Sequence, residues 1–175
     1  MNIFLTGFMG SGKTSTGKML AEKFSFTFID MDEMIEKKYG KTIKDIFYQW
    51  GETEFREIEK NVLNNIIQNH EKTVVATGGG TPCFFDNMKN MNKNGITIYL
   101  KVTPEKLFER LLNDNQGRPV LAGKKKLSAS IVELLAEREK FYNKAKFIVE
   151  VQDHDTIPQI IEKIQKILKT TRDGN

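Results

Sequence analysis

The sequence has few of the features that mark specialised classes of protein. It contains one cysteine, Cys83, so an intrachain disulfide is excluded and a reducing compartment is favoured. No apolar run approaches the ~20 residues that span a bilayer, so we expect no membrane segment. The chain enters an apolar strand and a glycine-rich loop at once, and we therefore expect no signal peptide and a cytoplasmic location.

The composition is that of an ordinary globular domain. The 175 residues are enough to bury one core, and no repeat or proline- and serine-rich linker divides them, so we expect a single domain over residues 1–175. The formal net charge of +4 is modest. The basic run at 124–126 lacks interleaved aromatic residues, which argues against a nucleic-acid partner.

Short β-branched and aromatic runs alternate with helical patterns along the chain. This alternation predicts a parallel sheet with helices on both faces, an α/β fold. We expect strands at 2–6, 27–31, 73–77, 96–102 and 147–151. We expect helices at 13–24, 32–39, 42–50, 52–69, 85–92, 104–113, 128–145 and 158–169.

The glycine-rich segment GFMGSGKT lies between the first expected strand and the first expected helix. Its pattern, G-x-x-x-x-G-K-[ST], cradles phosphates, because the glycines turn backbone N–H groups inward and the next helix presents its positive dipole end. Lys13 would reach the β- and γ-phosphates, and the Thr14 hydroxyl would ligate Mg²⁺. A glycine-rich turn without a ligand is the alternative, which this context disfavours. The ATP-binding residues predicted here are Gly10, Ser11, Gly12, Lys13, Thr14 and Ser15.

Two carboxylates, Asp30 and Asp32, stand where the second expected strand ends. If the strand continues, both point toward the phosphates. One could then hold Mg²⁺ through water, and the other could accept a proton from an attacking hydroxyl. The alternative is that Asp32 only caps the following helix, a common arrangement. The phosphate loop ahead of the pair favours the chemical role.

The segment GETEFREIE places Arg56 and Glu59 at i and i+3, as neighbours on a helix face. A surface ion pair of little energetic value is one interpretation. The aromatic residues Phe47, Trp50 and Phe55 lie close by in an otherwise polar segment. Because a guanidinium binds a carboxylate by two parallel hydrogen bonds, we favour a pocket for a small carboxylated ligand.

Three consecutive glycines, Gly78 to Gly80, follow the third expected strand. They remove every side chain where the sheet edge would meet a ligand, although a flexible turn is the alternative. Ligands of such sheets lie beyond the carboxyl ends of the strands. We therefore expect the long helical stretch at about 32–62 to be a substrate-binding insertion.

Two arginines remain as candidates. Arg118 lies in a glycine-bounded loop, and we expect the segment at about 114–126 to be a lid whose arginine neutralises charge on a transferring phosphoryl group. Arg138 lies on an expected helix, where its spacing alone favours a solvated residue.

Together these motifs resemble the shikimate kinase family over nearly the whole chain. They occur in order as GFMGSGKT, FIDMDEMIE, TIKDIF, GETEFREIE, TGGG and GRPVLAG. The resemblance implies ATP-dependent phosphorylation of the 3-hydroxyl of shikimate, with one Mg²⁺ ion, on the route to chorismate and the aromatic amino acids. It also implies a three-layer P-loop NTPase fold with a five-stranded parallel sheet in the order 2-3-1-4-5. We expect a monomer whose partners are the small molecules ATP and shikimate.

The resemblance also implies a role for each candidate. Asp32 matches the carboxylate that hydrogen-bonds the reacting hydroxyl, and Asp30 matches the one near Mg²⁺, with Thr14. The implied catalytic residues are Asp32, Lys13 and Arg118. Arg118 is also implied to contact an ATP phosphate. The adenine contacts have no clear match. The implied shikimate-binding residues are Asp32, Arg56, Gly79, Gly80, Arg138, Phe47, Phe55 and Glu59.

Three rival functions are weaker. A gluconate kinase of the same build would also bind a polyol carboxylate, but the GETEFREIE segment and the lid sequence favour shikimate. A nucleotide-dependent switch has no need of a second pocket that holds a carboxylate. Nucleic-acid binding is supported only by the sequence pI of about 9.0.

Overall fold

The computed structural model describes residues 1–113 and 124–173. Arg118, and with it most of the segment that we expect to be a lid, lies outside the described residues. The last positions of that segment, 124–126, begin a helix.

The core of the molecule is a five-stranded sheet whose neighbouring strands are all parallel, in the order β2-β3-β1-β4-β5. This order confirms the fold that the sequence predicts. β1, in the centre, and β3, beside it, are buried along their whole length, as expected when helices cover both faces of a parallel sheet. The strands are β1 (Asn2–Thr6), β2 (Thr27–Asp30), β3 (Thr73–Ala76), β4 (Gly95–Val102) and β5 (Phe147–Val151).

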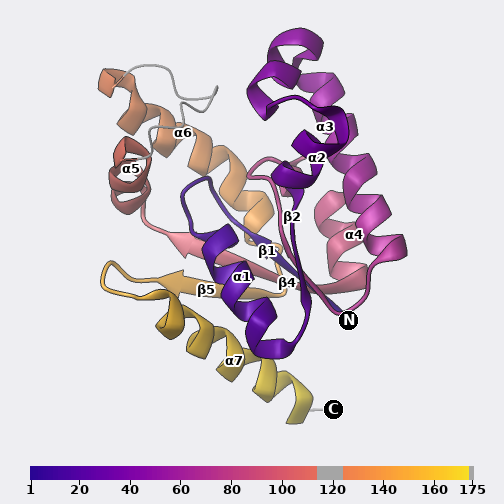
Figure 1. Cartoon of the computed structure of the whole chain (residues 1–175). Coiled ribbons are helices and arrows are strands. Elements are labelled where there is room, and N and C mark those ends of the chain that lie inside the picture. Colours follow the sequence, from indigo (N-terminus) through magenta and orange to yellow (C-terminus); the bar gives the residue numbers. More distant parts are fainter. Residues whose placement is uncertain (114–123, 174–175) are drawn as a thin grey trace.

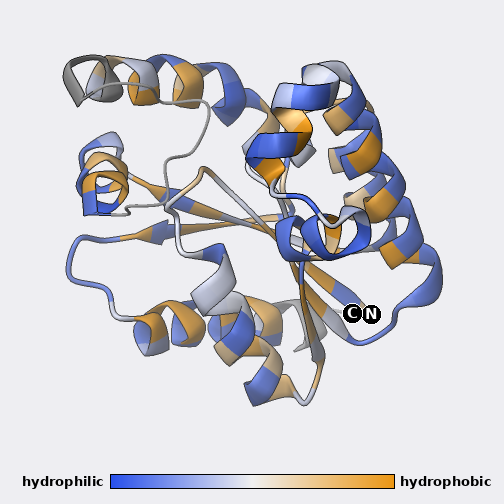
Figure 2. Ribbon diagram, turned by 45° about the horizontal axis from the view of Figure 1, so that its top comes forward, coloured by the Kyte–Doolittle hydropathy of each residue, from blue (hydrophilic) through white to orange (hydrophobic). Residues whose placement is uncertain are grey.

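Helices lie on both faces of this sheet (Figure 1). Figure 2 shows apolar residues along the strands and on helix surfaces turned toward them. No helix in the described ranges is long and apolar enough to cross a membrane. The helices are α1 (Lys13–Phe24), α2 (Met31–Tyr39), α3 (Ile43–Asn69), α4 (Asn87–Asn94), α5 (Pro104–Asn113), α6 (Lys124–Tyr142), α7 (Ile157–Asp173) and the 3-10 turn η1 (Thr81–Cys83).

The central strand β1 divides the core into two parts because its side chains alternate across the sheet. Ile3 and Leu5 pack in the cluster that holds Leu20 of α1 and Ile161 of α7. Phe4 points to the opposite face and packs in a second cluster, built largely from α2, α3 and α4. The phosphate-loop segment follows directly from this buried strand, so its position is fixed by the core.

One boundary differs from the prediction in a way that matters for the site, and another agrees with it. β2 ends at Asp30 and α2 begins at Met31, so the strand does not continue to Asp32. The two helices expected at 42–50 and 52–69 are confirmed as the two segments of α3, which Gly51 interrupts with a non-helical backbone conformation (φ 80°, ψ 173°). Thr42 begins α3 with a capping box, in which Thr42 and Asp45 satisfy each other's backbone N–H groups.

Candidate active site

The phosphate loop holds Lys13 at the N-terminus of α1. Gly12 adopts a left-handed conformation (φ 91°), which a residue with a side chain rarely takes, and lets the helix begin at Lys13. The ammonium group of Lys13 donates to the backbone carbonyls of Gly7 and Phe8, at 2.9 Å each. Because both bonds are made within the loop, the lysine is fixed at the positive end of the helix, where an anion would bind.

The side chain of Asp30, at the end of β2, forms hydrogen bonds with residues of both α1 and α2. One oxygen, Oδ2, accepts from the Thr14 hydroxyl at 2.7 Å. The other, Oδ1, accepts from the backbone N–H groups of Asp32 (3.0 Å) and Glu33 (3.4 Å). The expectation that a continuing strand aims both carboxylates is therefore wrong, and so is the alternative that Asp32 is the cap. Asp30 caps α2, and Asp32 lies in its first turn.

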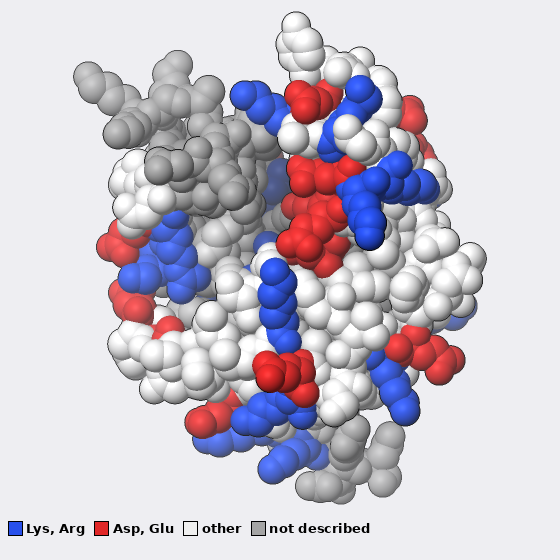
Figure 3. Space-filling model, in the orientation of Figure 1, with Lys and Arg blue, Asp and Glu red and all other residues white. Residues whose placement is uncertain are grey.

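One cavity of about 860 Å³ lies at the carboxyl edge of the sheet, where the strands of this fold meet their ligands. Figure 3 shows acidic side chains gathered where α2 borders a hollow in the molecule. Of the predicted site residues, Ser11 is buried within the loop and Arg118 is outside the described residues. The others all line the cavity: Gly10, Gly12, Lys13, Thr14, Ser15, Asp30, Asp32, Phe47, Phe55, Arg56, Glu59, Gly79, Gly80 and Arg138.

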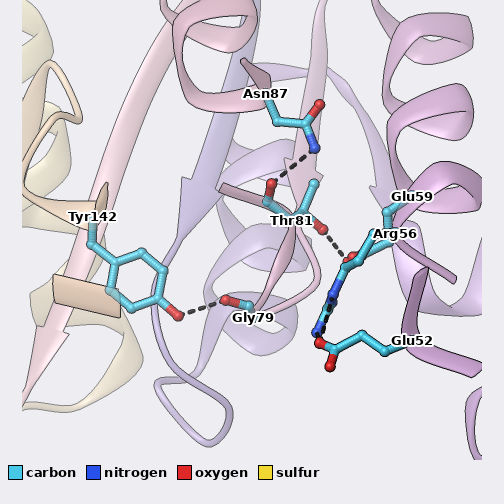
Figure 4. A network of polar contacts seen from close by, with 7 residues as sticks. All are labelled: Glu52, Arg56, Glu59, Gly79, Thr81, Asn87 and Tyr142. Atoms are coloured by element: carbon cyan, nitrogen blue, oxygen red, sulfur yellow. Dashed lines mark hydrogen bonds and ion pairs between the residues drawn. The ribbon is translucent and has the colours of Figure 1, made fainter. Parts of the chain in front are cut away.

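Arg56 lies in the wall of this cavity and is only 5% exposed. Its Nη1 donates to Glu59 at 2.6 Å. Its Nε and Nη2 donate to one oxygen of Glu52, at 3.1 and 2.7 Å. Glu59 is also held by the hydroxyl of Thr81. Figure 4 shows the guanidinium of Arg56 between the two carboxylates.

The electrostatics of this pair follow from its burial. Burial raises the pKa of the Glu59 carboxyl, and the positive charge of Arg56 opposes that rise. Burial alone would lower the pKa of Arg56, but Glu59 and then Glu52 outweigh it, so the pKa of the arginine rises. Arg56 therefore keeps its charge inside the protein, and a surface ion pair is the wrong description of Arg56 and Glu59.

Aromatic rings surround the guanidinium. The centres of the Phe47 and Phe55 rings are 4.4 Å apart, and both lie near the guanidinium carbon of Arg56, at 5.5 and 5.3 Å. Phe84 lies closer, at 4.2 Å. A cation over aromatic faces is attracted by their quadrupoles, so these rings hold the arginine without competing for its hydrogen bonds.

The glycines after β3 make room for the Arg56 network. A Cβ atom at Gly80 would lie 2.2 Å from Nη1 of Arg56, and one at Gly78 would lie 2.5 Å from Oε1 of Glu59. Either contact would displace a buried charged group. The carbonyl of Gly79 accepts from the hydroxyl of Tyr142 on α6, as Figure 4 shows. Close packing thus requires glycine at Gly78 and Gly80, so this segment is not merely a flexible turn.

Arg138 is not the solvated helix residue that its spacing favours. It is 7% exposed, and its guanidinium carbon lies 5.7 Å from the centre of the Phe8 ring. Its Nη1 would lie 3.6 Å from a Cβ atom at Gly79. Because α6 packs against η1, Arg138 faces the same cavity as Arg56, although the two lie on different elements.

Four residues of this region were not found from the sequence. Glu52, Thr81 and Tyr142 belong to the network around Arg56 and Gly79. Arg110 of α5 donates to the carbonyl of Gly10 at 3.0 Å and so supports the phosphate loop. Only Glu52 had a signal in the sequence, because it precedes Arg56 by four residues, a spacing at which helical side chains meet.

Comparison with known proteins gives one consistent result. The family model of shikimate kinase matches residues 9–169. The shikimate kinase of Azobacteroides pseudotrichonymphae is 47% identical over 167 residues, covering 93% of this chain and 98% of that protein. The shikimate kinase of Bacteroides fragilis is 44% identical over 173 residues, with 96% of each covered.

Solved structures agree with the sequence comparisons. A crystal structure of shikimate kinase from Bacteroides thetaiotaomicron superimposes with a TM-score of 0.90 at 41% identity, covering 97% of this chain and 98% of that one. A shikimate kinase from Acinetobacter baumannii, solved in complex with shikimate, gives a TM-score of 0.87 at 34% identity, covering 99% and 94%. The chain described here belongs to the shikimate kinase family.

Proposed function

We propose that the protein transfers the γ-phosphoryl group of ATP to the 3-hydroxyl of shikimate, with both substrates bound in the cavity of about 860 Å³ described above. As a member of the shikimate kinase family it is an ATP-using phosphotransferase of aromatic amino-acid biosynthesis. The observation that carries the proposal is that one cavity is lined by the phosphate loop, by Asp32, and by the buried arginines Arg56 and Arg138.

On the ATP side, Lys13 and the loop N–H groups would hold the phosphates. Lys13 now satisfies the carbonyls of Gly7 and Phe8, and a phosphate at the N-terminus of α1 would offer it charged acceptors within reach. Positive charge fixed in advance at this point stabilises the charge that spreads over the transferring group. Arg118, outside the described residues, is expected to add to this charge.

On the shikimate side, Arg56 and Arg138 would bind the carboxylate of the substrate. Both are buried in the cavity wall, where a charge-assisted hydrogen bond is stronger than in water. Gly79 and Gly80 would let the ring approach the backbone, with Phe47 and Phe55 as walls. Asp32 would accept a hydrogen bond from the reacting hydroxyl and hold it in line for transfer.

We also propose that Thr14 and Asp30 hold Mg²⁺, Thr14 directly and Asp30 through water. Their hydrogen bond of 2.7 Å places two oxygen groups of the kind that Mg²⁺ prefers beside the phosphate loop. No cluster of three or more acidic, histidine or cysteine ligands occurs in the described part of the chain, so phosphate and water oxygens would complete the ligand set. When bound, the ion would neutralise charge on the phosphates.

The test is a substrate panel. The protein is incubated with ATP, Mg²⁺ and, separately, shikimate, gluconate and other hydroxylated carboxylates, and the phosphate esters are identified by ³¹P NMR. We expect rapid formation of shikimate 3-phosphate and little product from the others. Preferential phosphorylation of gluconate, or ATP hydrolysis that no acceptor stimulates, would contradict the proposal.

A further inference from the structure

Arg56 makes three hydrogen bonds to two carboxylates that differ in exposure. Glu59 accepts from Nη1, and one oxygen of Glu52 accepts from both Nε and Nη2. The Nε and Nη2 edge is one of the two at which a guanidinium presents parallel donors to a carboxylate. Glu52 therefore occupies a position on Arg56 that a carboxylated ligand would also recognise.

The two glutamates differ sharply in exposure. The side chain of Glu59 is 2% exposed and is held by Thr81, so it cannot leave without breaking buried hydrogen bonds. The side chain of Glu52 is 58% exposed, although the side chain of its partner Arg56 is only 6% exposed. Glu52 can rotate into water at little cost once another carboxylate takes its place on Arg56, because its own side chain is already largely exposed.

The backbone gives Glu52 a second stable position. It is the first residue after the bend at Gly51, so it lies at the start of the second segment of α3. A carboxylate in the first turn of a helix is stabilised by the dipole and by unpaired N–H groups there. If Glu52 releases Arg56, its negative charge therefore remains in a favourable position at the start of this segment.

We infer that Glu52 is an exchangeable stand-in for the substrate carboxylate. It satisfies the Nε and Nη2 donors of Arg56 while the site is empty, and the carboxylate of shikimate displaces it on binding. This inference rests on the proposed function, because it takes Arg56 to be a carboxylate-binding residue. A buried guanidinium with unsatisfied donors is costly, so the stand-in keeps Arg56 charged and aligned. The consequence is that shikimate must compete with Glu52.

The experiment compares Glu52→Gln with the wild type by calorimetry. The variant keeps the size of the side chain but removes its charge, so it competes less well for Arg56. We expect shikimate to bind roughly two- to fivefold more tightly, the factor that corresponds to losing an exposed ion pair. Glu52→Ala, which removes the competing oxygens as well, should tighten binding in the same direction.

Two controls separate competition from other effects. Glu54→Gln removes the same charge from an exposed position two residues away, and it should leave the affinity unchanged. A shikimate analogue without the carboxylate should bind the wild type and Glu52→Gln equally. If Glu52 had only a structural role, Glu52→Gln would change the affinities for shikimate and for the analogue by the same factor.

Weaker or unchanged shikimate binding by Glu52→Gln, with normal binding by the wild type, would overturn this inference alone. So would equal tightening in Glu54→Gln, which would indicate a general charge effect. Failure of the wild type to bind shikimate would overturn the proposed function and this inference with it.

Discussion

Lys13 and Arg56 show how single residues hold charge inside this protein. Both are buried, and each is satisfied by the protein itself, Lys13 by two carbonyls and Arg56 by two carboxylates. A cation held in place before its ligand arrives needs little reorganisation when the ligand binds. Arg56 also has a buried counter-ion in Glu59.

The first prediction concerns Lys13. Lys13→Ala should lower turnover by about a hundred- to a thousandfold or more, because a donor aimed at developing charge contributes a factor of that size. Lys18, on the same helix with a side chain 59% exposed, provides the control, and Lys18→Ala should retain near-normal turnover. Steady-state kinetics and circular dichroism of both variants make the comparison. Near-normal turnover in a folded Lys13→Ala variant would refute the phosphate-loop assignment.

The second prediction concerns the reactivity of Cys83. Burial raises the pKa of its thiol to about 11, although Arg138 and Arg56 oppose this rise. The thiolate is the reactive form, so the rate of alkylation by iodoacetamide should rise about tenfold per pH unit from pH 8 to pH 10. Because the pKa is raised on folding, this group contributes stability that is fully present below about pH 9 and lost as the pH rises through about 11.

The control for Cys83 is the same protein unfolded in urea. Its alkylation rate should level off above about pH 9, as expected for a thiol with an ordinary pKa. A rate in the folded protein that levels off at the same pH would contradict the assignment of Cys83 as a half-buried thiol with a raised pKa.

The residues of the site could be predicted from the sequence where a local pattern carries the chemistry. Lys13, Thr14 and Arg56 belong to such patterns. Arg138 and Thr81 do not, because their burial depends on α6 and η1 packing together at the end of β3. From the residues alone, Arg138 resembled any solvated helix position, and only the family resemblance indicated its place.

At the scale of elements, the bend in α3 decides where Arg56 lies. Gly51 has φ 80° and ψ 173°, a conformation that is essentially restricted to glycine. The sequence predicts the two helical segments on either side of Gly51, and the structure confirms them, but the local pattern does not give the direction in which the second segment leaves the bend. The bend directs the second segment so that Arg56 and Glu59 face the glycines after β3.

The third prediction tests this bend. Gly51→Ala should lower the free energy of unfolding by about 2–3 kcal/mol, because alanine cannot adopt this backbone conformation without strain. The control is Gly40→Ala, at the left-handed end of α2 (φ 64°), where the loss should be nearer ~1 kcal/mol. Neither glycine has an atom within 4 Å of the added methyl group, so the comparison isolates backbone strain. Urea unfolding provides the measurement, and an equal or smaller loss in Gly51→Ala would contradict the account.

At the scale of the whole molecule, strand order brings the site together. β3 lies between β1 and β2, so the phosphate loop, Asp30 and the three glycines end side by side at one edge. The alternation of elements predicted a parallel sheet from local patterns alone. The order 2-3-1-4-5 followed only from the resemblance, because pairing between distant strands has no local signal in a single sequence.

The fourth prediction is that the protein is a monomer. Its exposed large apolar residues are spread over several elements, among them Tyr48 and Trp50 of α3, Val132 of α6 and Ile148 of β5. Light scattering after size exclusion should therefore give a mass near 20.1 kDa at micromolar concentration. A mass twice as large that persists on dilution would contradict it.

The central claim is that Arg56 binds the carboxylate of shikimate. Lysine at this position keeps the charge but loses the fork of parallel donors, so Arg56→Lys is not a conservative change. Losing a charge-assisted hydrogen bond, worth roughly 1.5–3 kcal/mol, should weaken shikimate binding by about ten- to a hundredfold. ATP affinity should stay the same, because Arg56 lies on α3 and not in the phosphate loop.

The most direct measurement is a calorimetric cycle of two proteins and two ligands. Wild type and Arg56→Lys are each titrated with shikimate and with an analogue that lacks the carboxylate. We expect the analogue to bind the wild type poorly and to lose little further affinity in the variant. The effects of the two changes on the binding free energy should therefore be strongly coupled. If Arg56→Lys weakens the analogue as much as it weakens shikimate, Arg56 only supports the fold, and the claim that it binds the substrate carboxylate is wrong.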